Sequence, residues 1–247
     1  MKKLLVASLL FLLAGTGAFA QTGEDILANA EAAANPDTDM EAVLSMTISD
    51  GRGASETRSV RMYQRGSDQF LMRFLSPADI RGVALLIDVQ DRDDDLIYLY
   101  LPAFRRERRI ASHVKNEEFM GTGLTYEDIA EIDYSDTYEV VSWSRTGPDY
   151  ALELRSKKEN STYDGARMVV DGESYLPVRT ELLQDGSVVK RLTVEDVGRH
   201  QGYWYAAKTV VELPGSGRRT VMEIESIEHD ASLDGALFSV RSLRRFR

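Results

Sequence analysis

The sequence predicts a mainly β protein built on a single large antiparallel sheet that curls on itself, with a helix before the first strand. Three observations support this prediction. Apolar and polar residues alternate with a period of two along most of the chain, which is typical of half-buried strands. Turn signals such as Asp185-Gly186 separate the alternating runs and favour hairpins. No linker and no internal repeat divides the chain, so we expect one domain over residues 21–247, curled to avoid two long edges.

The N-terminal end has the features of a secretory signal peptide. Lys2 and Lys3 precede an apolar run over residues 4–13, and Ala18-Phe19-Ala20 is a small-x-small cleavage signature. The run is too short for a membrane-spanning helix, which needs about 20 apolar residues. We therefore expect residues 1–20 to be removed after Ala20, leaving a periplasmic protein without a lipid anchor. Because only the two lysines are lost, the net charge would change from −10 to −12.

A helix opens the mature chain, and strands follow it. Thr22 and Asp25 have the spacing of a capping box, and Asn35-Pro36 ends the helical pattern. Period-two alternation then predicts strands over residues 41–49, 60–63, 70–74, 83–89, 96–101, 138–145, 150–156, 167–170, 178–184, 188–197, 204–213 and 220–229. The same patterning continues over residues 237–243, which predicts a strand at the C-terminal end.

One long segment lacks strand patterning. Residues 111–136 combine loop signals with short helical runs, and a loop of this length inside a compact domain is usually functional. We expect it to cross the curled sheet as a plug or lid over residues 114–129. The lid residues that we single out are Phe119, Met120, Gly121, Gly123 and Tyr126, with the two glycines as hinge points.

The residue patterns of common catalytic and metal sites do not occur. The chain has no cysteine, and its three histidines, His113, His200 and His229, are scattered without metal-ligand spacing. The acidic run over residues 91–95 lacks the glycine and the glutamate of a calcium loop, and Ser216 lies in a turn. We therefore expect no enzyme activity, no cofactor and no metal. A carboxylate pair of the glycosidase type stays open, so an envelope hydrolase is the remaining enzymatic alternative. The acidic balance argues against nucleic acid as a partner.

The densest basic run stands out in this acidic chain. It consists of Arg105, Arg106, Arg108 and Arg109 around Glu107. On a strand, Arg105, Glu107 and Arg109 would share one face, with Arg106 and Arg108 on the other. The run is either a charged edge strand that guards against aggregation or a dock for an anionic headgroup or an acidic partner surface.

Three motifs resemble those of the outer-membrane lipoprotein-sorting protein family, the relatives of the periplasmic carrier LolA. They are FLSPADIRGVAL at 74–85, YLYLPAFRR at 98–106 and FMGTGLTYED at 119–128, in the order found in the family. The resemblance covers nearly all of the mature chain. It implies an incomplete, half-open antiparallel β-barrel of about eleven strands, with an apolar concave face partly closed by helices. It also implies a carrier of lipoproteins or lipids, from a branch associated with RND-type inner-membrane exporters.

These observations together predict a non-enzymatic periplasmic carrier, which shelters the acyl chains of lipoproteins or lipids during their transport toward the outer membrane. Its partners would be lipoprotein acyl chains or lipid, an inner-membrane transporter and an outer-membrane acceptor, with only transient membrane contact. Inward-facing candidates for the apolar cavity are Leu44, Met46, Ile48, Val60, Met62, Phe70, Met72 and Phe74. A shift of strand register would place the other face inside. The alternative function is an accessory or sensor subunit that docks on an inner-membrane transporter or a regulatory partner.

Overall fold

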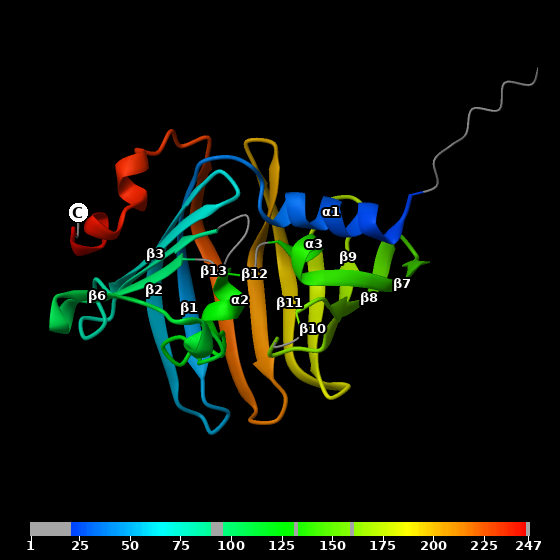
Figure 1. The fold of residues 1–247 in the computed structure, drawn as a ribbon, viewed down its shortest axis with the longest axis horizontal. Coiled ribbons are helices and arrows are strands. Elements are labelled where there is room, and N and C mark those ends of the chain that lie inside the picture. The colour runs from blue at the N-terminus through cyan, green and yellow to red at the C-terminus, as the bar shows by residue number, and fades with distance from the viewer. Residues whose placement is uncertain (1–20, 90–95, 131–132, 159–160, 246–247) are drawn as a thin grey trace, which may run out of the picture.

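A computed structural model describes residues 21–89, 96–130, 133–158 and 161–245. The predicted signal peptide and the acidic run over residues 91–95 lie outside the described residues. Within them, thirteen strands form one sheet, in the order β6-β5-β4-β3-β2-β1-β13-β12-β11-β10-β9-β8-β7 (Figure 1). The strands are β1 (Met40–Ser49), β2 (Ser55–Arg65), β3 (Gln69–Ser76), β4 (Ala84–Asp88), β5 (Leu96–Leu101), β6 (Arg106–Arg109), β7 (Tyr138–Thr146), β8 (Asp149–Ser156), β9 (Gly165–Val170), β10 (Pro177–Gln184), β11 (Ser187–His200), β12 (Tyr203–Leu213) and β13 (Arg218–His229).

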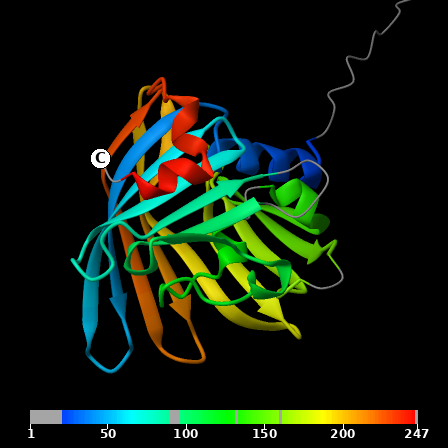
Figure 2. The ribbon, with the colours of Figure 1, turned by 60° about the vertical axis from the view of Figure 1, so that its left-hand side comes forward.

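The sheet is antiparallel throughout, curled and unclosed, which confirms the predicted fold class. Its two edges are β6 and β7, which are consecutive in the chain, whereas the first and last strands pair in the middle (Figure 2). The strand count implied by the family resemblance was too low. One of the thirteen strands, Arg106–Arg109, is a four-residue edge strand whose charged sequence has no apolar alternation.

The helices are short except for the first. They are α1 (Gly23–Ala34), α2 (Tyr126–Ala130) and α3 (Tyr134–Thr137), with 3-10 helices η1 (Pro102–Phe104), η2 (Ser112–Val114), η3 (Gly235–Phe238) and η4 (Val240–Arg244). Among the described helices, none is long and apolar enough to cross a membrane. The capping box of α1 is present as predicted, with Thr22 and Asp25 exchanging hydrogen bonds of 3.1 and 2.8 Å.

Helix α1 packs across one half of the sheet's concave face. Its buried residues Ile26, Leu27 and Ala30 join an apolar cluster with side chains of β7 to β10. Gly23 starts the helix at a point of close approach, because a Cβ there would lie 2.6 Å from Val140 and 2.8 Å from Trp143. Because glycine has no side chain, the helix can lie this close to the edge strand β7.

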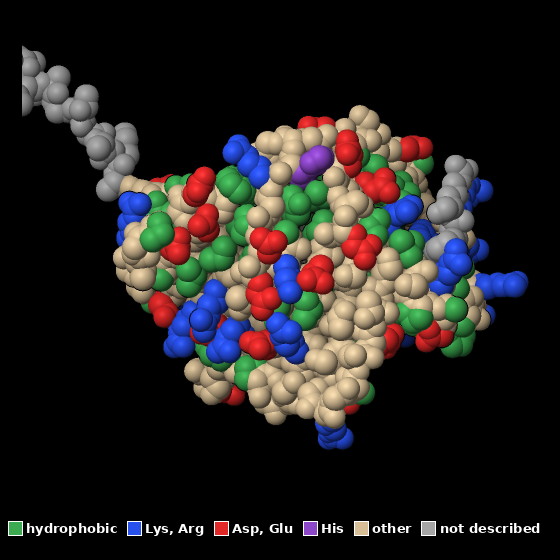
Figure 3. Space-filling model, turned by 180° about the vertical axis from the view of Figure 1, so that it is seen from behind, with side chains coloured by type: hydrophobic (Ala, Val, Ile, Leu, Met, Phe, Trp, Pro, Cys, Tyr) green, Lys and Arg blue, Asp and Glu red, His purple; other side chains and the backbone are tan. Residues whose placement is uncertain are grey.

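From β7 to β13, the outer face of the sheet carries many charged side chains (Figure 3). Side chains of opposite sign form ion pairs within and between the strands from β7 to β13. The pairs are Glu139–Arg155, Glu153–Arg167, Glu181 with Arg179 and Arg191, Glu212–Arg191, Glu195 with Lys208 and Arg219, and Glu223–Lys208. Alternation along each strand thus directs apolar residues inward and paired charges outward.

The C-terminal end does not form the predicted strand over residues 237–243. It forms η3 and η4, which pack against the outer side of β3 to β5. Phe238 and Leu243 are the buried contacts, and the buried Arg73 of β3 donates to the carbonyl of Leu243 at 3.0 Å. Apolar residues at every second or third position are compatible with both a strand and a helical turn. The Asp234 side chain caps Ala236 and starts the helical turn instead.

Candidate functional site

The eight predicted cavity residues share one face of the sheet and one apolar cluster. Leu44, Met46, Val60 and Phe74 are buried, and Ile48, Met62, Phe70 and Met72 are half-buried against them. Cross-strand register explains the grouping, because Leu44 lies opposite Val60, and Val60 lies opposite Phe74. The sheet therefore brings the whole set together on its concave side. Their use as a ligand-binding surface stays a prediction.

Further residues, which the sequence analysis did not single out, extend this apolar surface, which we call the apolar wall. They are Leu85 and Ile87 of β4, Ile97 and Leu99 of β5, and the half-buried Met222 and Ile224 of β13. The continuous apolar run over residues 83–87 was the available signal, since a strand buried on both faces loses its alternation. In β4, Leu85 and Ile87 face the concave side, while Ala84 and Leu86 contact the C-terminal helices.

Residues 111–130, which we call the lid, cover this wall. Phe119 and Tyr126 are 1% and 6% exposed and belong to the same cluster. The ring of Phe119 lies 5.9 Å from that of Phe74 and 5.4 Å from that of Tyr126, measured between centroids. Burial raises the pKa of the Tyr126 phenol above its ordinary value. The lid side chains thus occupy the apolar face in this structure.

The tip of the lid is a tight reversal. Glu118 and Thr125 form an isolated antiparallel bridge, and Gly121 and Gly123 between them have φ angles of 74° and 76°. Met120 is half-buried and also has a positive φ, of 52°. This left-handed backbone is accessible to glycine without steric cost, which explains the two glycines at the reversal. Their role as hinges stays a prediction.

Arg58 of β2 anchors the lid tip from the sheet. It lies opposite Met46, on the apolar face, and its Nη1 donates to the carbonyl of Met120 at 2.6 Å. Its guanidinium also pairs with Glu56 at 2.8 Å and lies 5.8 Å from the centre of the Phe74 ring. The lid backbone therefore accepts one of the hydrogen bonds that the buried Arg58 guanidinium has to donate.

A second anchor lies on β13. Arg218 donates to the Glu118 carboxylate at 2.8 Å and to the carbonyl of Gly121 at 2.9 Å. The hydrogen bond from Arg218 lowers the pKa of Glu118 below its ordinary value. Thr220 of the same strand donates to the carbonyl of Thr122 at 2.8 Å. These contacts fix the lid tip from the side opposite Arg58.

A third anchor is buried and charged. Lys190 of β11 donates to the carboxylate of Asp128 in α2, and both side chains are about 5% exposed or less. Lys190 also donates to the Tyr163 hydroxyl at 2.7 Å, which in turn donates to Asp128 at 2.9 Å. Next to it, Thr162 donates to Glu127 at 3.0 Å. The lid base is thus tied to the other half of the sheet.

Sequence reasoning missed Arg58 and Lys190, although a signal was present. Each occupies an inward position in an otherwise alternating strand, where an apolar residue is expected. A charged residue at such a position needs a buried partner, and here the lid supplies it.

The predicted basic run forms the edge of the sheet beside the lid. Arg106 and Arg108 lie opposite Leu101 and Leu99 on the concave side, while Glu107 and Arg109 lie on the other side, as predicted for this strand. The prediction for Arg105 was wrong, because it precedes the strand and has a left-handed backbone with a φ of 50°. A left-handed residue ends η1, so the alternation begins only at Arg106.

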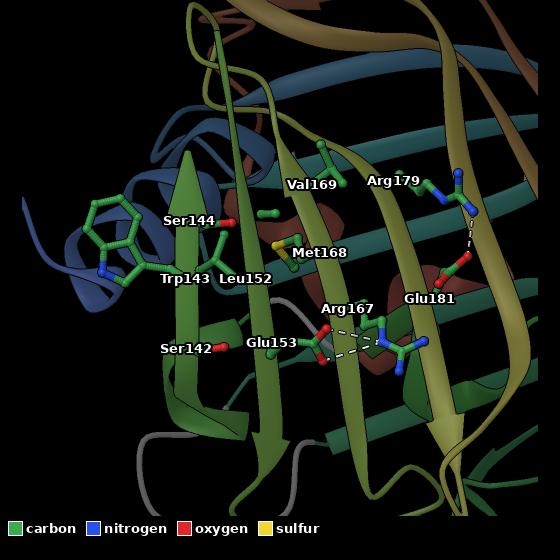
Figure 4. A pocket seen from close by; sticks show the side chains of 11 residues that line it. Ser142, Trp143, Ser144, Leu152, Glu153, Arg167, Met168, Val169, Arg179 and Glu181 are labelled. Atoms are coloured by element: carbon green, nitrogen blue, oxygen red, sulfur yellow. Dashed lines mark hydrogen bonds and ion pairs between the residues drawn. The ribbon is translucent and has the colours of Figure 1, made fainter. Parts of the chain in front are cut away.

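A shallow hollow of about 340 Å³ lies between β7 and β10 (Figure 4). Its polar walls include the pairs Glu153–Arg167 and Arg179–Glu181, so its charges already satisfy one another. Within the described part of the chain, no cluster of three or more His, Asp or Glu side chains is arranged to hold a metal ion. The concave wall and its lid are therefore the candidate functional site.

Comparisons with known proteins agree with this architecture. A domain assigned to outer-membrane lipoprotein sorting, from Vibrio parahaemolyticus, is 26% identical, with a TM-score of 0.81 over 90% of this chain and 98% of that one. A DUF1329 family protein from Desulfovibrio piger is 27% identical, with a TM-score of 0.82 over 90% and 97% of the two chains. A LolA superfamily protein from Nitrosomonas europaea shares the fold at 16% identity, with a TM-score of 0.72 over 90% of this chain and all of that one.

No curated protein sequence matches the chain. The sequence model of a family of uncharacterized proteins matches residues 66–245, which include the lid and eleven of the thirteen strands in whole. The chain therefore belongs to this family, and it has the LolA-like fold of the outer-membrane lipoprotein-sorting domains.

Proposed function

We propose that the protein is a non-enzymatic periplasmic carrier that shelters acyl chains of lipids or lipoproteins on the concave apolar wall. The observation that carries this proposal is the apolar wall itself, which is covered by a separate lid whose aromatic side chains pack where a ligand would lie. The likeness to a domain assigned to outer-membrane lipoprotein sorting supports it.

The physical requirement of such a carrier is an apolar surface large enough for a hydrocarbon chain. Burial contributes about 0.8 kcal/mol per CH₂, so one acyl chain of ordinary length needs on the order of 10 kcal/mol of shelter from water. The wall spans six strands, β13 and β1 to β5, and is lined by aliphatic, methionine and phenylalanine side chains. Methionine suits such a wall because its unbranched thioether adapts to ligands of different shape.

Loading requires the lid to leave the wall. Phe119 and Tyr126 fill the space above Phe74, so an acyl chain would replace them as contacts of the wall. Among the described residues, the lid pairs with no strand of the sheet, and it is held by side-chain anchors from Arg58, Arg218 and Lys190. Displacing it would break these few polar contacts and leave the sheet intact.

The cellular location follows from the expected signal peptide, with cleavage after Ala20. A mature net charge of −12 would weaken adhesion of most of the surface to anionic leaflets, which favours a shuttle over a protein that stays bound.

The alternative function is an accessory or sensor subunit that docks on an inner-membrane transporter or a regulatory partner. The exposed arginines at the β6 edge favour it, since arginine pairs well with carboxylates of an acidic partner. Under this alternative, charge reversal at Arg106 and Arg108 would abolish capture of the partner, while acyl uptake would be absent in every variant.

The carrier proposal is tested by ligand content and uptake. The protein purified from its native host is extracted and analysed for lipid by mass spectrometry, and the delipidated protein is titrated with the fluorescent fatty acid cis-parinaric acid. We expect bound lipid and saturable uptake, which Met62→Glu on the wall abolishes. Val141→Glu on the exposed part of β7 is the matched control, with uptake unchanged. An empty extract together with no uptake by the wild-type protein would overturn the proposal.

A further inference from the structure

One end of the molecule carries arginines that come from two separate elements. Arg105, Arg106, Arg108 and Arg109 lie in or just before β6, and Arg241 and Arg245 lie in or just after η4 on the outer side of the same edge. The Glu107–Arg244 pair joins the two elements, with hydrogen bonds of 2.5 and 2.7 Å. We call these six arginines the basic edge. All six are exposed.

The arginines of the basic edge differ from those of the other charged surfaces because they form no ion pairs with carboxylates among the described residues. On the outer face from β7 to β13, Arg155 and Arg167 each have a carboxylate on a neighbouring strand, and Arg219 of β13 has the carboxylate of Glu195 on β11. The ion pairs found among the described residues include none of the six arginines of the basic edge. Six arginines without an ion pair among the described residues create a positive local potential, opposite in sign to the net charge of −10 of the whole chain.

An exposed aromatic side chain lies at the tip of this edge. Phe104 is 71% exposed, more than Val141 or Trp143, the other large apolar side chains that are well exposed in the described chain. It ends η1 immediately before Arg105, whose left-handed backbone turns the chain into β6. The tip therefore presents an apolar ring directly beside guanidinium groups.

Anionic lipid headgroups match this chemistry. Guanidinium groups bind phosphate bidentately, and basic side chains close to an anionic leaflet are attracted to its surface potential. An aromatic ring beside them can enter the interfacial layer between headgroups and acyl chains. Arg106 and Arg108 point to one side of the sheet and Arg109 to the other, an arrangement that suits a plane of many phosphates better than a single shaped pocket.

We infer that the basic edge docks the protein on an anionic lipid bilayer, with Phe104 entering the headgroup layer. This inference rests on the proposed function, since a lipid carrier must meet a membrane to load or deliver. The docked orientation would bring the lid to the membrane, because Arg106 and Arg108 lie opposite Leu101 and Leu99 of the apolar wall and the lid follows β6 directly. The remaining acidic surface would be repelled, which makes the contact oriented and reversible.

The test is flotation of the mature full-length protein with phosphatidylcholine vesicles, with and without phosphatidylglycerol, over a range of salt. We expect binding only to the anionic vesicles, weakening as salt increases. The triple variant Arg106→Glu, Arg108→Glu, Arg241→Glu should lose roughly tenfold or more of its partition coefficient. Phe104→Ser should bind less tightly with an unchanged salt dependence.

The control variant carries the same change of net charge elsewhere. Arg52→Glu, Arg155→Glu and Arg167→Glu reverse three exposed arginines away from the basic edge, and we expect roughly twofold loss or less. Equal loss in both triple variants, or equal binding to neutral vesicles, would overturn the inference. Binding that requires membrane proteins and disappears when the vesicles are treated with protease would also overturn it, in favour of an acidic protein partner.

Uptake of cis-parinaric acid, measured on the same variants, separates this inference from the proposed function. The triple variant of the basic edge should take up the probe like the wild type while failing to float. A wild-type protein that floats with anionic vesicles but takes up no probe would support docking and contradict the carrier.

Discussion

Lys190 of the sheet and Asp128 of the lid form an ion pair that is almost fully removed from water, at 4% and 5% side-chain exposure. The Tyr163 hydroxyl contacts both partners, so that the three groups form a closed network. Buried pairs of this kind are costly to break from one side, because the remaining charge stays buried without an opposite charge to neutralise it.

We therefore predict that Lys190→Met destabilises the protein by about 3–5 kcal/mol in urea unfolding. The double variant Lys190→Met, Asp128→Leu should recover much of this loss, since no uncompensated charge remains. Arg179→Met, which removes an exposed arginine of the outer face, is the control and should change stability by less than about 1 kcal/mol. A Lys190→Met variant as stable as this control would contradict the prediction.

The hydrogen bond from Arg58 to the lid backbone gives a second prediction, on lid motion. Arg58→Ala removes a charged donor from the carbonyl of Met120, a contact of about 1.5–3 kcal/mol. We expect amide hydrogen exchange over residues 118–125 to accelerate by roughly tenfold or more, with faster uptake of cis-parinaric acid. Arg61→Ala on the opposite face of the same strand should leave the lid amides protected. Unchanged lid exchange in Arg58→Ala would exclude this arginine as an anchor.

We predict that His229 makes the stability of the protein depend on pH. It is 2% exposed and stacks on Tyr203, and burial lowers its pKa below the ordinary value of 6.5. The unfolded chain then takes up the proton first, so stability falls as the pH decreases below 6.5 and levels off once the pH is below the folded-state pKa. We expect the urea midpoint to decrease from pH 8 to pH 5, and His229→Phe to flatten this part of the profile. An identical slope in His229→Phe would assign the pH dependence to other groups.

The close approach of α1 to β7 gives a prediction at Gly23. A Cβ there would lie 2.6 Å from Val140 and 2.8 Å from Trp143, so Gly23→Val forces the helix away from the edge strand. We expect a loss of about 1–3 kcal/mol and a changed Trp143 fluorescence spectrum. Asn29→Ala, at an exposed position of the same helix, is the control and should be neutral or slightly stabilising. Full stability in Gly23→Val would show that the helix position is not fixed by this contact.

Most of the sheet could be predicted because its strands follow a strict period of two. Leu44, Met46 and Ile48 alternate with Ser45 and Thr47, and the observed strand carries the same face inward. The lid could be located for the opposite reason, as a long stretch without this period. Local patterns report which residues are buried, and both features depend on burial alone.

The anchors and the C-terminal end were not predicted because they depend on partners far away in the chain. Arg58 contacts a carbonyl 62 residues later, and Lys190 contacts a carboxylate 62 residues earlier. The helices η3 and η4 exist because β3 to β5 leave an apolar outer surface to cover, which their own sequence does not indicate. Single-strand patterning cannot distinguish such a cover from one more strand.

The order of the strands has a mechanical consequence. The first and last strands, β1 and β13, are joined along a seam of ten paired positions in the middle of the sheet, while the two free edges belong to consecutive strands, β6 and β7. The chain between these edges contains the lid, which packs on the concave side of the sheet and, among the described residues, pairs with none of its strands. We therefore expect that displacing this segment leaves the hydrogen bonds between the strands in place, so that the sheet and the segment covering it unfold with separate stabilities.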